Sequence, residues 1–171
     1  MELAGAWEVS FDPKWGGPEK IMFDKLEDWT KRPEEGIKFY SGIATYKISF
    51  DLQLKSQNPN PKTFLSIGEV KNVARVKLNG RDLGVVWTAP WQVAIPGGLL
   101  KEKGNELCIE VANLWPNRLI GDATLPKEKR RTVTNVRIYD AMVEDCKKAG
   151  KPVEPLLLPS GLMGPVRVME E

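Results

Sequence analysis

Three tryptophans are the residues of this sequence best suited to bind a ligand. Trp87 and Trp91 bracket the segment VWTAPW at residues 86–91, and Trp115 lies in the segment NLWPNR. An indole face stacks well on the apolar face of a sugar ring, and nearby polar side chains can hydrogen-bond the hydroxyl groups. The pattern therefore favours carbohydrate binding. The alternative is that the tryptophans close the ends of a protein core.

A polar cluster follows Trp115, in a loop predicted at residues 113–126. It contains Asn117, Arg118 and Asp122, with two apolar residues between the arginine and the aspartate. Arg118 and Asp122 could form a bidentate ion pair that makes the loop rigid. They could equally present a polar surface to a ligand or a neighbouring domain. We predict that this loop is the functional edge, because apolar residues beside polar groups often mark contact surfaces.

Catalysis by the chain itself is not expected. The sequence contains no histidine, which excludes Ser-His-Asp and Cys-His nucleophile pairs and every zinc site that uses histidine. Glycoside hydrolysis needs two carboxyl groups flanking a sugar, one of them with a raised pKa. The candidates are Glu69, Asp82, Glu110 and Asp122, but their spacing singles out no pair. A small hydrolase that uses surface carboxylates is the remaining enzymatic alternative.

No cofactor is predicted. The sequence has no EF-hand loop, no Cys/His metal motif and no glycine-rich phosphate loop. A calcium ion held by backbone carbonyls and one or two carboxylates would leave no motif, so a metal site stays open. Cys108 lies in an apolar strand pattern and is predicted to be a buried thiol. Whether it forms a disulfide with Cys146 is also open.

The composition is that of an ordinary globular protein of one domain. Of its 171 residues, 42% are hydrophobic and 28% are charged, and the net charge is +2. The one dense basic run, at residues 127–131, has no aromatic neighbour, so a solvated loop is expected there and nucleic acid is not a predicted partner. No apolar run approaches the roughly 18 residues of a membrane span. The first residues also lack the basic and apolar regions of a secretion signal.

Alternating apolar and polar residues predict a β-rich fold. The longest alternating stretches are residues 44–52, 65–67, 74–78 and 107–111, with shorter candidate strands at 7–11, 83–87, 91–95, 133–138 and 166–169. Asn79-Gly80 can supply positive φ at a turn and predicts a hairpin of residues 76–78 and 83–86 with a slightly long loop, and the proline-rich residues 56–61 cannot continue a strand. Short helices are predicted only at residues 24–31 and 139–148. These elements favour an all-β fold, an antiparallel β-sandwich of the jelly-roll type.

Four segments resemble the sugar-binding jelly-roll domain of glycoside hydrolase family 2. They are GIATYK at residues 42–47, NGRDLG at 79–84, GNEL at 104–107 and EVAN at 110–113. Each segment is short, but their order and spacing match a strand entry, a central Asn-Gly hairpin and a late strand that ends in asparagine. The resemblance implies a galactose-binding-like β-sandwich.

Two longer segments are similar to the C-terminal part of large bacterial α-L-rhamnosidase-like proteins of glycoside hydrolase family 106. They are NLWPNRLIGD at residues 113–122 and LPSGLMGPV at 158–166. The resemblance as a whole covers residues 42–168, the family-like core, while residues 1–41 would be an N-terminal extension or the first strands of a single domain. In such proteins the catalytic carboxylates lie in a barrel of roughly 250 residues, which this chain cannot contain.

The resemblance implies a non-catalytic accessory module of a larger hydrolase. Its expected partners are carbohydrate, the catalytic domain of the same parent, or both, and the parent would be periplasmic or extracellular. The expected role is to dock on the catalytic domain or to shape substrate access to it. An autonomous carbohydrate-binding module is the alternative, and the contact candidates are the same in both cases: Trp87, Trp91, Trp115, Asn117, Arg118 and Asp122.

Overall fold

The computed structural model describes residues 1–52 and 62–170. Strands dominate, and the helices are few and short. In chain order the elements are β1 (Trp7–Ser10), β2 (Ile21–Phe23), α1 (Glu35–Lys38), β3 (Ile43–Phe50), β4 (Thr63–Ser66), β5 (Glu69–Lys71), β6 (Val73–Leu78), β7 (Arg81–Val86), β8 (Gln92–Ile95), β9 (Asn105–Ala112), α2 (Pro116–Ala123), α3 (Ile138–Lys148), β10 (Gly161–Gly164) and β11 (Arg167–Glu170). The short 3-10 helices are Pro13–Trp15, Trp29–Lys31, Lys127–Lys129 and Glu154–Leu156.

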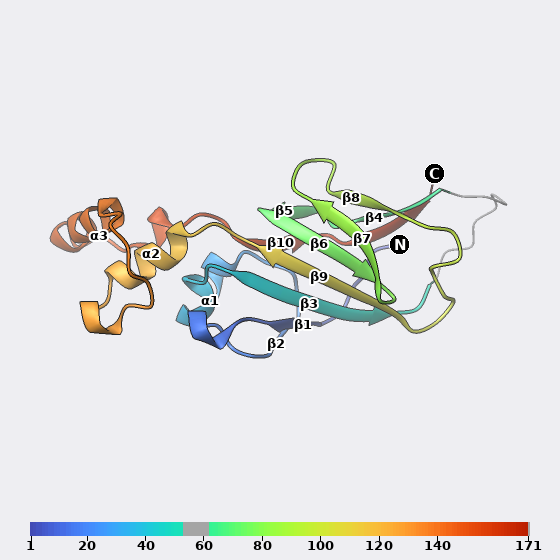
Figure 1. The fold of residues 1–171 in the computed structure, drawn as a ribbon, viewed down its shortest axis with the longest axis horizontal. Coiled ribbons are helices and arrows are strands. Elements are labelled where there is room, and N and C mark those ends of the chain that lie inside the picture. Colours follow the sequence, from blue (N-terminus) through green and yellow to red (C-terminus); the bar gives the residue numbers. More distant parts are fainter. Residues whose placement is uncertain (53–61, 171) are drawn as a thin grey trace.

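Two layers of antiparallel strands make up the body of the molecule (Figure 1). One layer is a sheet with the strand order β2-β1-β3-β9-β6-β7. The other contains the three-stranded sheet β11-β4-β8 and the pair β10-β5. Buried residues of both layers belong to one hydrophobic core, among them Tyr46 and Ile109 from the large sheet and Leu65 and Val168 from the other layer. The predicted all-β sandwich is confirmed.

The central strands follow the alternation of the sequence. β3 and β9 pair over their full length, from Ile43 opposite Ala112 to Phe50 opposite Asn105. In β9 every second residue from Asn105 to Val111 is buried, because successive side chains of a strand point to opposite faces of the sheet. Sequence periodicity therefore decides which face meets the core.

The Asn79-Gly80 hairpin joins β6 and β7, as predicted, but more tightly. Leu78 pairs with Arg81, so the turn contains only two residues. Their φ angles are +50° at Asn79 and +80° at Gly80, the left-handed conformation that asparagine and glycine adopt most readily in such turns. An irregularity at Val76 and Lys77 shifts the register of the hairpin.

Two predicted elements differ in the structure. Residues 133–138 form no strand: Val133 is fully exposed, and α3 begins at Ile138. The helix predicted at residues 24–31 is reduced to the 3-10 turn Trp29–Lys31, because the backbone is extended at Asp28, which caps the turn, and again at Arg32. The helix predicted at 139–148 is present as α3. The turn predicted at residues 56–61 lies outside the described residues.

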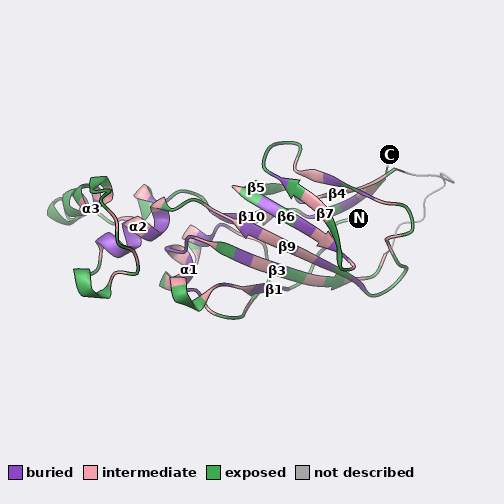
Figure 2. Cartoon of the chain, viewed as in Figure 1, coloured by how far each residue is buried: buried purple, intermediate pink, exposed green. Residues whose placement is uncertain are grey.

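The two longer helices, α2 and α3, lie beyond one end of the sandwich (Figure 1). The chain enters this helical end, residues 114–158, directly from β9. A second, smaller core holds it together, formed by Phe39, Ile120, Ala123, Val143 and Leu157. Figure 2 shows exposed residues over much of α3 and buried ones along α2, so α2 is the element that anchors this end to the body.

Candidate functional site

The predicted loop at residues 113–126 contains a helix, which corrects the expectation from the sequence. Pro116 occupies the first turn of α2, where a missing backbone N–H costs nothing and the fixed φ suits the helix. Gly121 allows the helix to approach the body closely, since a Cβ there would lie 2.6 Å from the Cβ of Phe39. Ile120 is buried in the second core, so it folds inward rather than forming an exposed edge.

Arg118 and Asp122 form the predicted ion pair inside this helix. Arg118 Nε lies 3.1 Å from Asp122 Oδ1, and the two side chains are 6% and 3% exposed. The pair is not bidentate as predicted: this contact lacks hydrogen-bond geometry, and Arg118 Nη1 donates instead to the carbonyl of Trp15 at 3.2 Å. Burial lowers the pKa of Arg118 while the Asp122 carboxylate opposes that shift. An arginine still remains charged at neutral pH.

Asp122 also fixes the chain that follows α2. Its Oδ2 accepts hydrogen bonds from the backbone N–H groups of Arg131 at 3.1 Å and Thr132 at 2.8 Å, and from the Thr132 hydroxyl at 2.6 Å. One carboxylate therefore joins α2 to the segment that leads to α3. The side chains of Arg118 and Asp122 therefore both bind other parts of the same chain.

The Asn117 side chain likewise forms only internal hydrogen bonds. Its Nδ2 donates to the Leu158 carbonyl at 2.8 Å and to Ser160 Oγ at 3.0 Å, and its Oδ1 accepts from the Leu158 N–H at 2.8 Å. The side chain is 1% exposed. These bonds tie α2 to the segment before β10 and leave no polar atom facing solvent.

The three tryptophans do not form one cluster. Trp115 is 51% exposed and meets the ring of Trp15 edge-on, with the ring centroids 5.2 Å apart. Trp87 and Trp91 lie on the connection that leaves the edge strand β7 for β8, whereas Trp115 follows the central strand β9. Trp87 is 71% exposed, and Trp91 is half-buried against the main core. Two of the three indoles are thus available for contacts.

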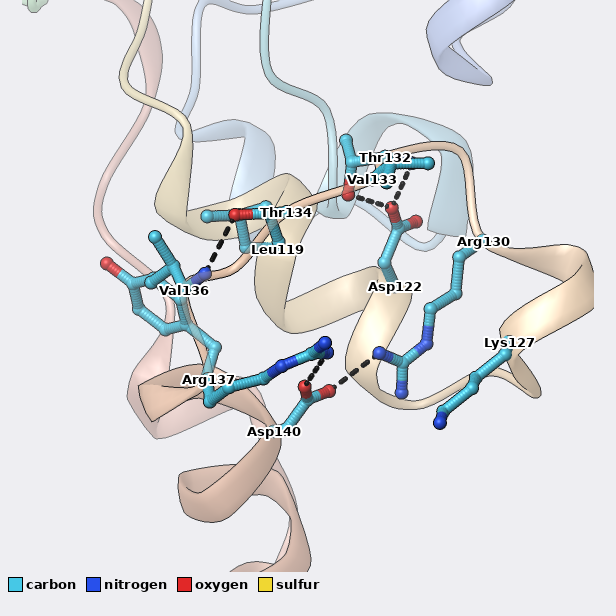
Figure 3. Close-up of a pocket in the computed structure, with 11 residues that line it drawn as sticks. Leu119, Asp122, Lys127, Arg130, Thr132, Val133, Thr134, Val136, Arg137 and Asp140 are labelled. Atoms are coloured by element: carbon cyan, nitrogen blue, oxygen red, sulfur yellow. Dashed lines mark hydrogen bonds and ion pairs between the residues drawn. The ribbon is translucent and has the colours of Figure 1, made fainter.

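A pocket that the sequence did not indicate opens beside α2. It has a volume of about 210 Å³ and lies between the second half of α2, residues 127–137 and the start of α3. Arg130 and Arg137 approach Asp140 from two sides, with Lys127 beside them (Figure 3). Arg130 Nη1 lies 2.7 Å from Asp140 Oδ1, and Arg137 Nη1 lies 3.5 Å from Oδ2.

Two of the three basic residues of this pocket, Lys127 and Arg130, come from the run that the sequence predicted as a solvated loop, and Arg137 follows it. Residues 127–129 form an exposed 3-10 turn, but Arg130 is held by Asp140 and by the Leu125 carbonyl. The available signal was a run of cations placed shortly before a helix. The pocket was missed because it forms only when α3 folds back against α2, and periodicity does not reveal such a tertiary contact.

The structure was also compared with the requirements of metal and membrane sites and of a disulfide. Among residues 1–52 and 62–170, no three histidine, cysteine, aspartate or glutamate side chains gather so that they could hold a metal ion. None of the described helices has the length and hydrophobicity needed to cross a membrane. Cys108 is half-buried rather than buried, and both Cys108 and Cys146 are free thiols.

Comparison with known proteins identifies the relatives of the chain. A protein of Formosa agariphila named as a candidate β-glucuronidase is 36% identical over 177 aligned residues, which cover 97% of this chain and 15% of that protein. The rhamnosidase of Novosphingobium sp. PP1Y superposes on all of this chain with 38% identity and a TM-score of 0.82, over 15% of its own length. The relatives are glycoside hydrolases. No family model matches the chain.

The likeness to glycoside hydrolases extends to more distant structures. A β-glucuronidase of Ruminococcus gnavus covers 66% of this chain with 19% identity and a TM-score of 0.52, which shows a shared fold alone. The chain spans only about 15% of the length of its two nearer relatives. It therefore corresponds to a domain-sized part of such hydrolases.

Proposed function

We propose that this chain is a non-catalytic module of the sugar-binding, galactose-binding-like jelly-roll type, which docks on the catalytic domain of a larger glycoside hydrolase. The observation that carries the proposal is the match of the whole chain to a small part of a rhamnosidase at a TM-score of 0.82. The parent would act on α-L-rhamnosides or related glycosides in the periplasm or outside the cell. The proposal requires no cofactor.

The state of the carboxylates supports a non-catalytic role. Glu69 pairs with Lys71 at 2.7 Å, Glu110 with Lys77 at 2.7 Å, and Asp122 is the buried partner of Arg118. The fourth candidate, Asp82, pairs with Arg75, which lowers its pKa. A general acid for glycoside hydrolysis needs a raised pKa and a second carboxylate nearby. All four candidates instead have a cationic partner.

Exposed apolar side chains support docking through the helical end. Most of the large apolar side chains that are exposed in the described residues lie within residues 114–158: Leu114, Trp115, Leu125, Val133, Val136, Ile138 and Leu158. Apolar surface gathered on one end of a domain is typical of a contact with another protein part. The occupant we propose is the catalytic domain of the same polypeptide, because the relatives are more than six times longer than this chain.

Association in trans tests this docking. The isolated chain is titrated, in a calorimeter, into a parent hydrolase from which the segment corresponding to this chain has been deleted. Trp115→Ala is expected to weaken association about tenfold, roughly 1.4 kcal/mol, at a temperature where the variant is fully folded although it loses the ring contact with Trp15. Met22→Ala on β2 is the matched control, because Met22 is 52% exposed and Trp115 is 51% exposed. Equal effects of the two variants would contradict docking through the helical end.

A further inference from the structure

We propose that the pocket between α2 and α3 binds the carboxylate of an acidic sugar, a uronic acid residue. This goes beyond the proposed docking function, because it assigns the helical end a ligand of its own. The pocket is lined by three cationic side chains, Lys127, Arg130 and Arg137, and one carboxylate, Asp140, pairs with both arginines, so the cations outnumber the carboxylate that they share. The Asp122 carboxylate also borders the pocket, but Arg118 balances its charge.

The three cationic side chains have N–H donors that form no hydrogen bond within the described residues. An arginine side chain has five N–H donors in a planar fork, yet Arg137 uses one of them, in the 3.5 Å contact with Asp140, and its side chain is 68% exposed. Arg130 uses Nε and Nη1, which leaves Nη2 without a bond in the described residues. Lys127 makes no ion pair there either. A carboxylate placed between these groups would gain charge-assisted hydrogen bonds.

The remaining lining suits a sugar. Thr134 and the apolar side chains of Val133 and Val136 border the pocket (Figure 3), and Tyr139 is part of its lining as well. This mixture can contact both the hydroxyls and the apolar face of a pyranose ring. At about 210 Å³ the pocket is smaller than the roughly 300–1,000 Å³ typical of drug-sized ligands. It therefore fits a group of monosaccharide size.

A second, wider hollow continues from the pocket along α3. It has a volume of about 730 Å³ and shares Lys127, Arg130, Arg137 and Asp140 with the first. The cations thus lie at the junction of two hollows, where an oligosaccharide could extend past the bound uronate. α3 also begins here, and its first backbone N–H groups add positive potential that Asp140 in the first turn partly offsets.

The test is titration of the isotope-labelled chain with sodium glucuronate, followed by backbone amide shifts in NMR spectra, with glucose as the uncharged counterpart. Glucuronate is expected to shift amides of residues 130–140 in a saturable manner, and glucose to bind at least tenfold more weakly. Arg137→Gln should weaken glucuronate binding about tenfold. Arg81→Gln, an exposed arginine of the β6–β7 hairpin, is the matched control and should leave binding unchanged.

Several outcomes would overturn the proposal. They are equal shifts by glucuronate and glucose, no shift with either sugar, or an equal loss of binding in the two arginine variants. Tighter binding of a tetraglutamate peptide than of glucuronate would identify the pocket as a site for an acidic protein segment instead. Because the titration uses the chain alone, its failure leaves the docking on a catalytic domain untouched.

Discussion

Replacing Asp122 by alanine is predicted to be strongly destabilising. The change leaves the Arg118 guanidinium, 6% exposed, without its ion-pair partner. It also removes the acceptor of three hydrogen bonds from Arg131 and Thr132. Removing one partner of a buried pair costs about 3–5 kcal/mol, because the remaining charge stays buried and uncompensated. The free energy of unfolding should fall by that amount.

The expected change in melting temperature follows from the size of the chain. One kcal/mol corresponds to about 2–4 °C for 150–250 residues, so Asp122→Ala should lower the melting temperature by about 6–20 °C in scanning calorimetry. Hydrogen exchange should place the largest loss of protection in α2 and in the segment that leads to α3. Asp82→Ala, which breaks the exposed pair with Arg75, should leave the melting temperature nearly unchanged.

A double variant separates the charge from the packing. Arg118→Met combined with Asp122→Leu removes both charges and keeps apolar volume, a replacement that is often neutral for buried pairs. It should be more stable than Asp122→Ala alone. If Asp122→Ala destabilised the chain no more than Asp82→Ala does, the ion pair would not be what anchors α2 to the body, and the reasoning would be refuted.

Three further predictions concern the body and the anchor of α2. Burial raises the pKa of Tyr46 above that of an unfolded tyrosine, which is about 10. The protonated phenol therefore stabilises the fold fully below about pH 10, and this contribution falls by about 1.4 kcal/mol per pH unit as the pH rises above 10. Tyr46→Phe should flatten that alkaline loss of stability in urea titrations. Gly161→Ala should lower the melting temperature far more than Gly150→Ala: both glycines have positive φ, but only at Gly161 would a Cβ lie 2.4 Å from the Trp29 indole nitrogen. Asn117→Ala should cost about 2–3 kcal/mol in chemical denaturation, since it removes buried hydrogen bonds to residues 158–160.

The long strands and several short ones, such as β1 and β8, could be predicted from the sequence, but three short strands were missed. β3 and β9 each contain eight residues, enough for the alternation to stand out. β2, β5 and β10 contain only three or four residues, and they were missed because an alternation of apolar and polar residues cannot be recognised over so few positions. Residues 133–138 show the reverse error: Val133 and Val136 suggested a strand, but no neighbouring strand pairs with them.

The candidate site was predicted in part, through the Arg118–Asp122 pair. Its setting was wrong, because the pair lies in α2 and not in a loop; Pro116 at the first helical turn was the signal for a helix. The pocket was missed because Arg130 and Asp140 come together only when α3 packs beside α2. Contacts between elements depend on tertiary packing, which local periodicity and motifs do not reveal.

The central claim is that the chain is an accessory module with no glycosidase activity of its own. Its most direct test is turnover of a panel of nitrophenyl glycosides by three samples: the isolated chain, the parent hydrolase lacking it, and the two mixed. We predict no turnover by the isolated chain, impaired turnover by the truncated parent, and recovery on mixing. Hydrolysis by the isolated chain that disappears on mutating one of its carboxylates, or a truncated parent with unimpaired turnover, would contradict the account.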